Sequence, residues 1–158
     1  MYELPFAKRS RWLGGWTLAG IATYSSGLRV NLAVQGNPSN TGGADRPNVV
    51  GDWRLSASQR SLARWFDTAA FEANPAFTFG NASRNQMSGP SLSVMDFAIY
   101  KTFKINERLR TQFRAEAFNA TNTPAFSSPN AQVRNPAFGQ INEAGRPRNL
   151  QLGLKVIF

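Results

Sequence analysis

The carboxylates Asp96 and Glu116 come closest to a catalytic arrangement in this sequence. Each lies in a segment where polar and apolar residues alternate, and we expect the two segments to be neighbouring strands with both carboxylates on one face. Two facing carboxylates can act as a general acid and a general base. Arg110 and Arg114 fall on the same face, so ion pairs with these arginines are the simpler role. We therefore expect no catalysis at this pair.

Composition removes most other kinds of active site. The 158 residues include no cysteine and no histidine, which excludes disulfides, thiolate chemistry, imidazole catalysis and most zinc sites. A serine nucleophile would then need a lysine as its base, but neither Lys104 nor Lys155 has a serine motif near it. Gly42-Gly43 lacks the downstream lysine of a phosphate-binding loop. We expect no enzyme, and no catalytic residue, metal ligand or cofactor site.

The net charge of +9 comes from 18 basic and 9 acidic residues. Such an excess is found in proteins that bind nucleic acid, anionic membranes or acidic ligands. Apart from the cluster Lys8, Arg9 and Arg11, the basic residues are spread along the chain, which favours a solvated, mixed surface and no nucleic-acid partner. The alternative is a free-standing basic β-domain that binds nucleic acid, with an affinity that falls steeply as salt rises.

Alternation with a period of two dominates the chain and predicts strands with two unlike faces. Charges at every second position of 108–119 cannot lie in a dry core, but they can line a water-filled lumen while their neighbours face lipid. Lys101 is an exception on an apolar face, which a lysine tolerates near the membrane interface. The expected strands are 2–6, 16–24, 28–35, 93–103, 108–119 and 149–158, and the expected lumen-lining residues are Arg29, Asp96, Tyr100, Arg110, Gln112, Arg114, Glu116 and Lys155.

Short and long connections alternate along the chain. The segments 36–92 and 120–148 are long and rich in Pro, Gly, Asn and Ser. Structureless loops of this size are unusual in compact soluble domains, whereas outer-membrane barrels carry short turns at one end and long loops at the other. If the last strand ends in the periplasm, both long loops lie outside the cell, and the basic cluster Lys8, Arg9 and Arg11 would lie there too. Within the first loop, Ser58 to Phe66 could form a short helix.

The C-terminal residues from Gln151 to Phe158 resemble the β-signal of bacterial outer-membrane proteins. A polar residue, Gln151, is followed by Gly153, the hydrophobic Val156 and the aromatic Phe158 at the carboxy-terminus. An alternating edge strand with unpaired backbone groups can pair with the edge of an assembly machinery.

A wider resemblance rests on a series of short motifs: Tyr2 to Phe6, Gly14 to Ile21, Ala44 to Asn48, Arg64 to Phe71, Phe79 to Asn85 and Phe113 to Asn119. In this order, and ending in the β-signal, the series is similar to TonB-dependent receptors of the Oar-like type. The resemblance implies part of a barrel of about 22 strands that is preceded by a plug and a carboxypeptidase-regulatory-like domain. Signal peptide, TonB box, plug and most strands are absent from this sequence, so we expect a C-terminal fragment in which energy coupling does not reside.

Residues 1–158 are thus expected to form one segment of an all-β transmembrane barrel in the outer membrane, an antiparallel meander of five to six strands. Its expected partners are outer-membrane lipid, the β-barrel assembly machinery, an unidentified cargo and, only through parts outside this chain, the TonB complex. The candidates for contacts with cargo are Arg64, Trp65, Phe66 and Phe126, because exposed aromatic side chains in loops often contact ligands. Packing of the loops against each other is the alternative role for these residues.

Overall fold

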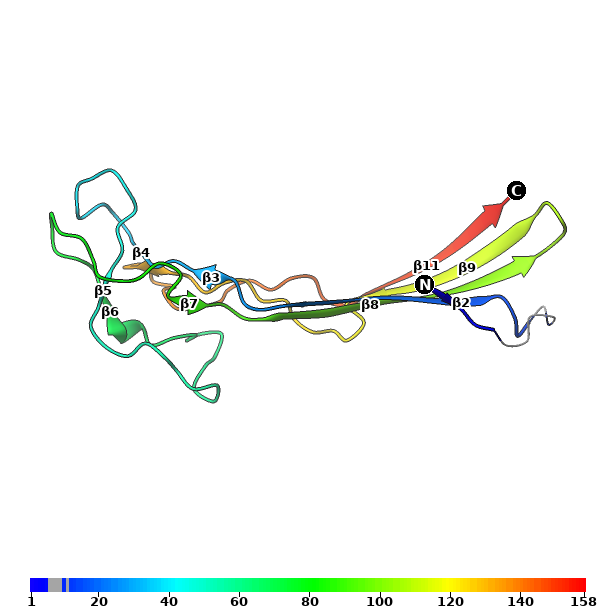
Figure 1. The fold of residues 1–158 in the computed structure, drawn as a ribbon, viewed down its shortest axis with the longest axis horizontal. Helices are drawn as coiled ribbons and strands as arrows, with labels where there is room; N and C mark the ends of the chain where they lie inside the picture. Colours follow the sequence, from blue (N-terminus) through cyan, green and yellow to red (C-terminus); the bar gives the residue numbers. More distant parts are fainter. Residues whose placement is uncertain (6–9, 11) are drawn as a thin grey trace. The chain divides into compact units, whose positions relative to one another are not determined.

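The computed structural model describes residues 1–5, 10 and 12–158 and divides them into two compact units (Figure 1). The sheet unit comprises Met1–Ser25, Leu92–Ala125 and Arg146–Phe158. The loop unit comprises Ser26–Ser91 and Phe126–Gly145. The helical structure among the described residues is one turn of 3-10 helix, η1 (Thr68–Ala70). No helix in the described ranges is long and apolar enough to span a membrane.

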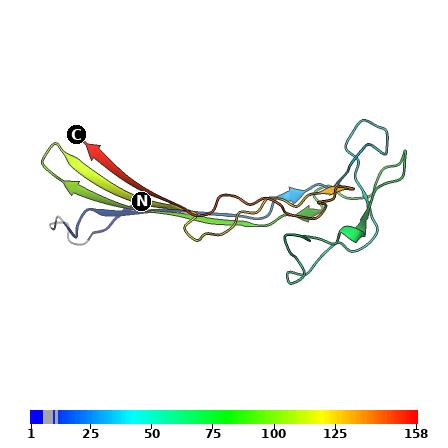
Figure 2. The same ribbon diagram turned by 180° about the vertical axis from the view of Figure 1, so that it is seen from behind.

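The sheet unit is an antiparallel meander (Figures 1 and 2). Its strands follow one another across the sheet in chain order, which confirms the expected fold class. The expected segments 2–6, 16–24, 93–103, 108–119 and 149–158 overlap these strands, although the first shrinks to two residues. The strands are β1 (Tyr2–Glu3), β2 (Trp16–Ser25), β8 (Leu92–Lys104), β9 (Arg110–Phe118) and β11 (Asn149–Ile157).

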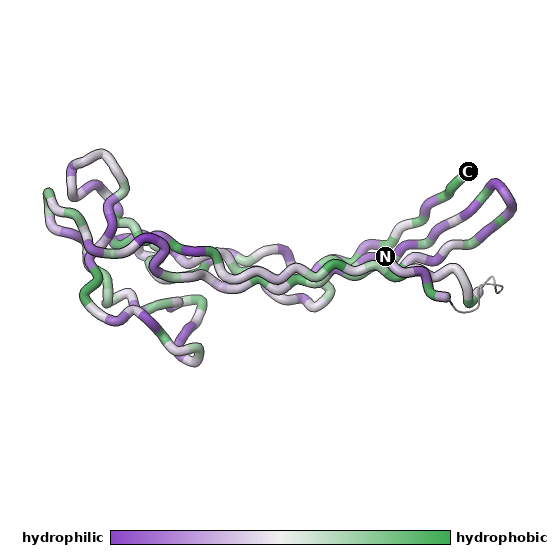
Figure 3. Tube along the Cα trace, viewed as in Figure 1, coloured by the Kyte–Doolittle hydropathy of each residue, from purple (hydrophilic) through white to green (hydrophobic). Residues whose placement is uncertain are grey.

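The register aligns apolar residues with apolar residues, and polar residues with polar residues, on neighbouring strands of the sheet. Leu152 pairs with Ala115, Ala115 with Ile99, and Ile99 with Leu18. Three positions away, a polar row runs from Lys155 through Gln112 to Thr102. Because successive side chains point to opposite faces, the sheet has one largely apolar face and one largely polar face, and Figure 3 shows the alternation along each strand.

Register also decides which connections share an end of the sheet. Trp16 pairs with Lys101, so the segment that precedes β2 lies at the same end as the 105–109 turn and Phe158. The expectation that the basic cluster Lys8, Arg9 and Arg11 lies on the side of the long loops concerns residues outside the described ranges and stays a prediction.

The segment 28–35 is not a wall strand. It forms two short strands of the loop unit, β3 (Arg29–Val30) and β4 (Ala33–Val34). The first pairs with β7 (Met87–Ser88), and the second pairs in parallel with β10 (Gln132–Val133). Val30, Leu32 and Val34 on the apolar side are buried against protein instead of facing lipid, whereas Leu28 is exposed. Alternation identifies a strand with one apolar side, but it does not reveal what covers that side.

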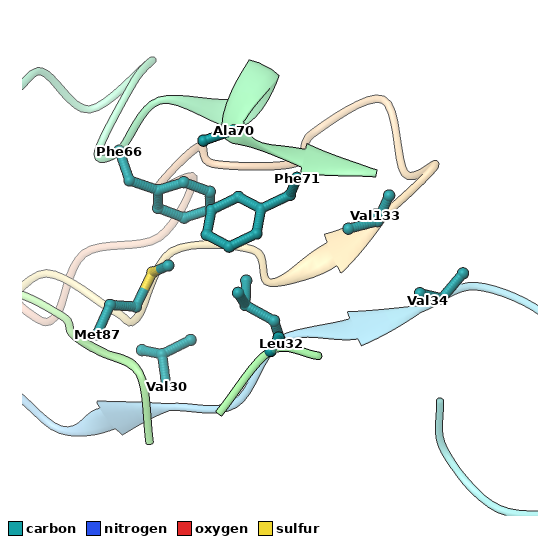
Figure 4. Close-up of a cluster of buried hydrophobic side chains, with 9 residues drawn as sticks. Val30, Leu32, Val34, Phe66, Ala70, Phe71, Met87 and Val133 are labelled. Atoms are coloured by element: carbon teal, nitrogen blue, oxygen red, sulfur yellow. The ribbon is translucent and has the colours of Figure 1, made fainter. Parts of the chain in front are cut away.

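A hydrophobic core holds the loop unit together, so the two long loops are not structureless. The Phe66 ring meets those of Phe71 and Phe138 edge-on, with centroid distances of 5.7 and 5.2 Å. Phe138 belongs to the second loop, so the core joins segments far apart in the sequence. Figure 4 shows the aromatic rings and aliphatic side chains converging. The buried core residues are Val30, Leu32, Val34, Phe66, Ala70, Phe71, Ala82, Met87 and Val133.

The expected helix from Ser58 to Phe66 is wrong. This stretch consists of turns, and Ser61 and Arg64 form an isolated bridge. The Trp65 amide donates to the Gly139 carbonyl at 2.9 Å, and the next side chain, Phe66, enters the core. A hydrogen bond to the second loop therefore replaces the local bonds that a helix would need. The remaining pair of short strands is β5 (Asn48–Val49) with β6 (Phe71–Glu72).

Asp45 is a buried carboxylate that ties the first loop to β4. Its Oδ1 accepts a hydrogen bond from the Ser39 hydroxyl at 2.5 Å, and its Oδ2 accepts one from the Ser39 amide at 2.7 Å. Its backbone carbonyl accepts a hydrogen bond from the Val34 amide at 2.8 Å. The hydrogen bonds from the Ser39 side chain and backbone lower the pKa of Asp45 below its ordinary value, because they favour the ionised form.

Acid should weaken the loop unit through Asp45. Its pKa is lower in the folded chain than in the unfolded chain, so the stabilisation is fully present above the ordinary aspartate pKa of about 3.9. It is lost as the pH falls through the lower folded value. We expect Asp45→Asn to remove this part of the acid transition, and Ser39→Ala to move it to higher pH. Tryptophan fluorescence during acid titration measures both effects, and an unchanged transition in Asp45→Asn would contradict this role.

Candidate functional site

The apolar face of the sheet is exposed over all four long strands. On β11, Leu150, Leu152 and Leu154 are 71%, 72% and 69% exposed, and Phe97 and Phe113 lie exposed on the neighbouring strands. Their register places them in one continuous surface. Monomeric soluble proteins rarely expose contiguous apolar patches of such extent. Such a face needs an apolar covering, and the hydrocarbon of a bilayer is one environment that supplies it.

A hydrogen-bonded network covers the polar face. The Tyr100 hydroxyl donates to Glu116 Oε1 at 3.2 Å, and the Arg114 guanidinium lies 4.9 Å from the Tyr100 ring centroid. Arg114 Nε donates to Gln112 Oε1 at 3.0 Å, and Gln112 Nε2 to Thr102 Oγ1 at 3.3 Å. These groups satisfy one another without burial in an apolar core. Such a surface suits contact with water.

The expectation that ion pairs form on this face is wrong. Within the described ranges, ion pairs join only Arg54 to Asp52 and Arg64 to Asp67, both in the loop unit. Asp96 instead accepts a hydrogen bond from the Asn119 amide at 2.8 Å. Register is the reason, because Arg114 lies opposite Tyr100, four residues from Asp96.

The residues expected to line the lumen are divided between the two units. Asp96, Tyr100, Arg110, Gln112, Arg114, Glu116 and Lys155 all lie on the polar face of the sheet, as their strand positions and register require. Arg29 does not, because it lies on β3 in the loop unit. The expectation that Arg29 belongs to the wall is wrong for the same reason as the expected strand 28–35.

Lys101 interrupts the apolar face, but its ammonium group does not extend to solvent. The residue is 2% exposed. Its Nζ donates to the Trp12 carbonyl at 2.8 Å and also to the Gly14 carbonyl. It lies 5.2 and 5.1 Å from the ring centroids of Trp16 and Phe103. The segment before β2 thus covers this charge, and aromatic rings gather at the end of the sheet that carries the C-terminus.

The β-signal-like residues lie on an edge strand. β11 is last in the strand order, so the side turned away from β9 has no neighbour within the described chain. Gly153 pairs with Arg114, and an added Cβ at Gly153 would meet the Arg114 Cβ at an ordinary 3.8 Å. Packing in this sheet therefore does not demand glycine there. Phe158 is exposed, while Gln151 and Val156 lie on opposite faces of β11.

The four candidate contact residues of the loops have different surroundings. Phe66 is 1% exposed and packs in the core, so it is not the exposed loop residue that was expected. Trp65 is half-buried, and its Nε1 donates to the Ser88 carbonyl at 2.9 Å. Arg64 is exposed and paired with Asp67 at 2.9 Å. Phe126 is half-buried beside the bridge that it forms with Ala144.

The sequence patterns did not point to Trp53, Arg54 and Arg60, which line a cavity of the loop unit together with Arg29 and Trp65. These residues come from separate turns, so spacing along the chain carries no signal for their proximity. In the described part of the chain, no cluster of three or more acidic, histidine or cysteine side chains could hold a metal ion.

Comparison with known proteins adds one match. A family model described as "Outer membrane beta barrel domain" matches residues 1–151. No curated protein matches the chain, and no solved structure matches it.

Proposed function

This chain belongs to the outer membrane β-barrel domain family, and from that premise we propose that it is part of a TonB-dependent receptor or transporter of the Oar-like type. The protein is located in the outer membrane. In this proposal the sheet unit supplies barrel wall and lumen lining, the loop unit lies outside the cell, and β11 carries the assembly signal. It has no catalytic step and no cofactor.

The observation that carries the proposal is that the paired strands form a sheet with one apolar face and one polar face. Nine residues in β9 and in β11 match the ~9–11 residues that a tilted strand needs to cross a bilayer. The apolar row through Leu152 and Ala115 would face lipid, and the network of Tyr100, Arg114 and Glu116 would face the water-filled lumen. In water the apolar face would stay exposed unless another layer of protein covered it.

Closure of the barrel needs more strands than the described sheet contains. The order runs from β1 to β11 without the two edges meeting, and the smallest common barrels have about eight strands. We therefore propose that further strands complete the wall, as the resemblance to Oar-like receptors implies. The motifs from Tyr2–Phe6 to Phe113–Asn119 support the TonB-dependent type, and transport direction is left open by them.

Assembly is the second role of the sheet in this proposal. The unpaired edge of β11 could pair with the β-barrel assembly machinery through backbone hydrogen bonds before the wall closes. Gln151, Gly153, Val156 and Phe158 would be read at that stage. The freedom of Gly153 to accept a side chain in the folded sheet supports a role for this glycine outside the packing of the sheet.

Cross-linking in living cells tests the TonB-dependent type. We expect the outer-membrane protein that carries this chain to form a photo-cross-link to TonB at its periplasmic side, and the link to vanish when TonB is absent. A protein that fractionates with the outer membrane but never cross-links to TonB would overturn the receptor assignment. A chain that stays in the aqueous phase and binds oligonucleotides with steep salt dependence would support the nucleic-acid alternative instead.

A further inference from the structure

A cavity of about 240 Å³ in the loop unit combines arginine and tryptophan side chains. The half-buried side chains of Trp53 and Trp65 line it, and the core residues Phe66 and Met87 line its apolar side. Every lining residue lies between Arg29 and Ser88, inside the loop unit. The cavity therefore needs no contribution from the sheet.

The charge around this cavity has one sign. Arg29, Arg54 and Arg60 line it, and in the described part of the chain no acidic residue does. Of these arginines, only Arg54 forms an ion pair, with the exposed Asp52 at 3.3 Å. Arg60 donates only its Nε to the Leu55 carbonyl, at 3.0 Å. Guanidinium N–H groups thus stay available to an anion.

Two of the arginines are held in place by the indole rings. The Arg54 guanidinium lies 4.7 Å from the Trp53 ring centroid, and that of Arg60 lies 5.5 Å from the Trp65 ring centroid. Trp65 is itself fixed by its hydrogen bond to the Ser88 carbonyl. Cation–π contacts of this kind orient the guanidinium groups before a ligand arrives, which lowers the entropic cost of binding.

We propose that this cavity binds the acidic end of an aromatic ligand, namely a carboxylate carried on a planar ring. The carboxylate would accept hydrogen bonds from the arginines, and the ring would pack on the half-buried indoles of Trp53 and Trp65. The volume lies below the ~300–1,000 Å³ of drug-sized pockets, so it suits a small ligand or the end group of a larger one. This ligand would be the cargo, and in that respect alone the inference rests on the proposed function.

A sugar acid fits the cavity less well than an aromatic acid. Sugar hydroxyls must also donate hydrogen bonds, and two acceptors of the lining are already engaged: the Ser88 carbonyl by Trp65, and Gln86 Oε1 by the Ser83 amide. Buried hydroxyls without partners cost free energy. The aromatic ring has no such requirement, and it can pack on the indoles of Trp53 and Trp65.

Binding of benzoate tests this assignment on the protein purified from outer membranes in detergent. We expect heat on titration and a change in tryptophan fluorescence, with an affinity that weakens as salt rises. Benzamide, which lacks the charge, and galacturonate, which lacks the aromatic ring, should each bind at least about tenfold more weakly, since each loses one of the two interactions.

Arg29→Gln is the sharpest variant because Arg29 is exposed on β3 and has no ion-pair partner within the described chain. It should weaken benzoate binding by roughly tenfold. Arg84→Gln is the matched control, since Arg84 is also exposed in the loop unit but lines a different cavity, and it should leave binding unchanged. Arg54→Gln provides the same test should Arg29→Gln alter the near-ultraviolet circular dichroism of the fold.

Three outcomes would overturn the inference: no benzoate binding, equal binding of benzamide or galacturonate, or equal losses in Arg29→Gln and Arg84→Gln. Failure of the proposed function is distinguishable from failure of this inference. Benzoate binding that survives without any cross-link to TonB would leave the site intact and remove only its role in TonB-dependent transport.

Discussion

Leu152→Arg should largely prevent insertion of the sheet into lipid vesicles, whereas Gln151→Arg, one residue away, should be tolerated there because no assembly machinery reads Gln151. Leu152 lies near the middle of β11 on the apolar face, is 72% exposed and pairs with Ala115. An arginine on the lipid-facing side near the bilayer midplane costs about 2–4 kcal/mol. At Gln151 the new arginine would face Glu116 across the polar face, where opposite charges are compatible.

Folding into lipid vesicles measures this difference. The two variants and the parent protein are compared by the fraction that resists added protease and by the urea concentration at the midpoint of unfolding. The two substitutions add the same side chain to neighbouring positions of one strand, so loss of β-propensity or a general charge effect would be shared. Equal damage from both would contradict the two-faced sheet, and greater damage from Gln151→Arg would reverse the assignment of the faces.

Phe66→Ala should unfold much of the loop unit and leave the sheet able to assemble. Phe66 is 1% exposed and meets Phe71 and Phe138, so its removal opens a cavity between the two long loops. Phenylalanine-to-alanine substitutions in cores cost about 3–5 kcal/mol. A unit that depends on one small core has little stability to spare.

Hydrogen exchange in the assembled protein reports each unit separately. In Phe66→Ala we expect faster exchange at amides of the loop unit, such as those of Val34 and Trp65, which donate across it, and unchanged exchange in β8 and β9. Phe79→Ala is the control, because Phe79 lies in the same unit but is 75% exposed, and it should change stability by less than about 0.5 kcal/mol. Uniform exchange changes in both units would show that they do not fold independently.

A loop unit with its own core changes how the side chains of the long loops can meet a ligand. Loops without a core would present residues such as Arg64 and Trp65 in many arrangements. With Phe66 buried, the neighbouring turns hold Arg60 and Trp65 at fixed positions around a cavity. A preorganised site loses less entropy on binding than a mobile loop does. Ligand binding at this surface would therefore depend on a few side chains held in defined positions.

The sequence alone determined the wall. In 108–119 and 149–158 the alternation runs along most of the strand, with Phe118 and Ile157 as exceptions on the polar side, and a period of two admits only one assignment of faces. The antiparallel order followed because the 104–107 turn between β8 and β9 is short. Such local signals survive whatever packs on the sheet, so the polar rows through Glu116 and Lys155 lie where they were expected.

Only the tertiary structure decided the fate of 28–35 and of the long loops. Val30, Leu32 and Val34 alternate as a wall strand would, and the partners that cover them, Phe66 and Val133, come from segments far away in the chain. Phe66 likewise changed from an exposed ligand contact to a core residue. Arg29 and Trp53 became neighbours of one cavity for the same reason. Contacts between distant segments leave no periodic trace in a single sequence, because the pattern of one segment does not show which other segment covers it.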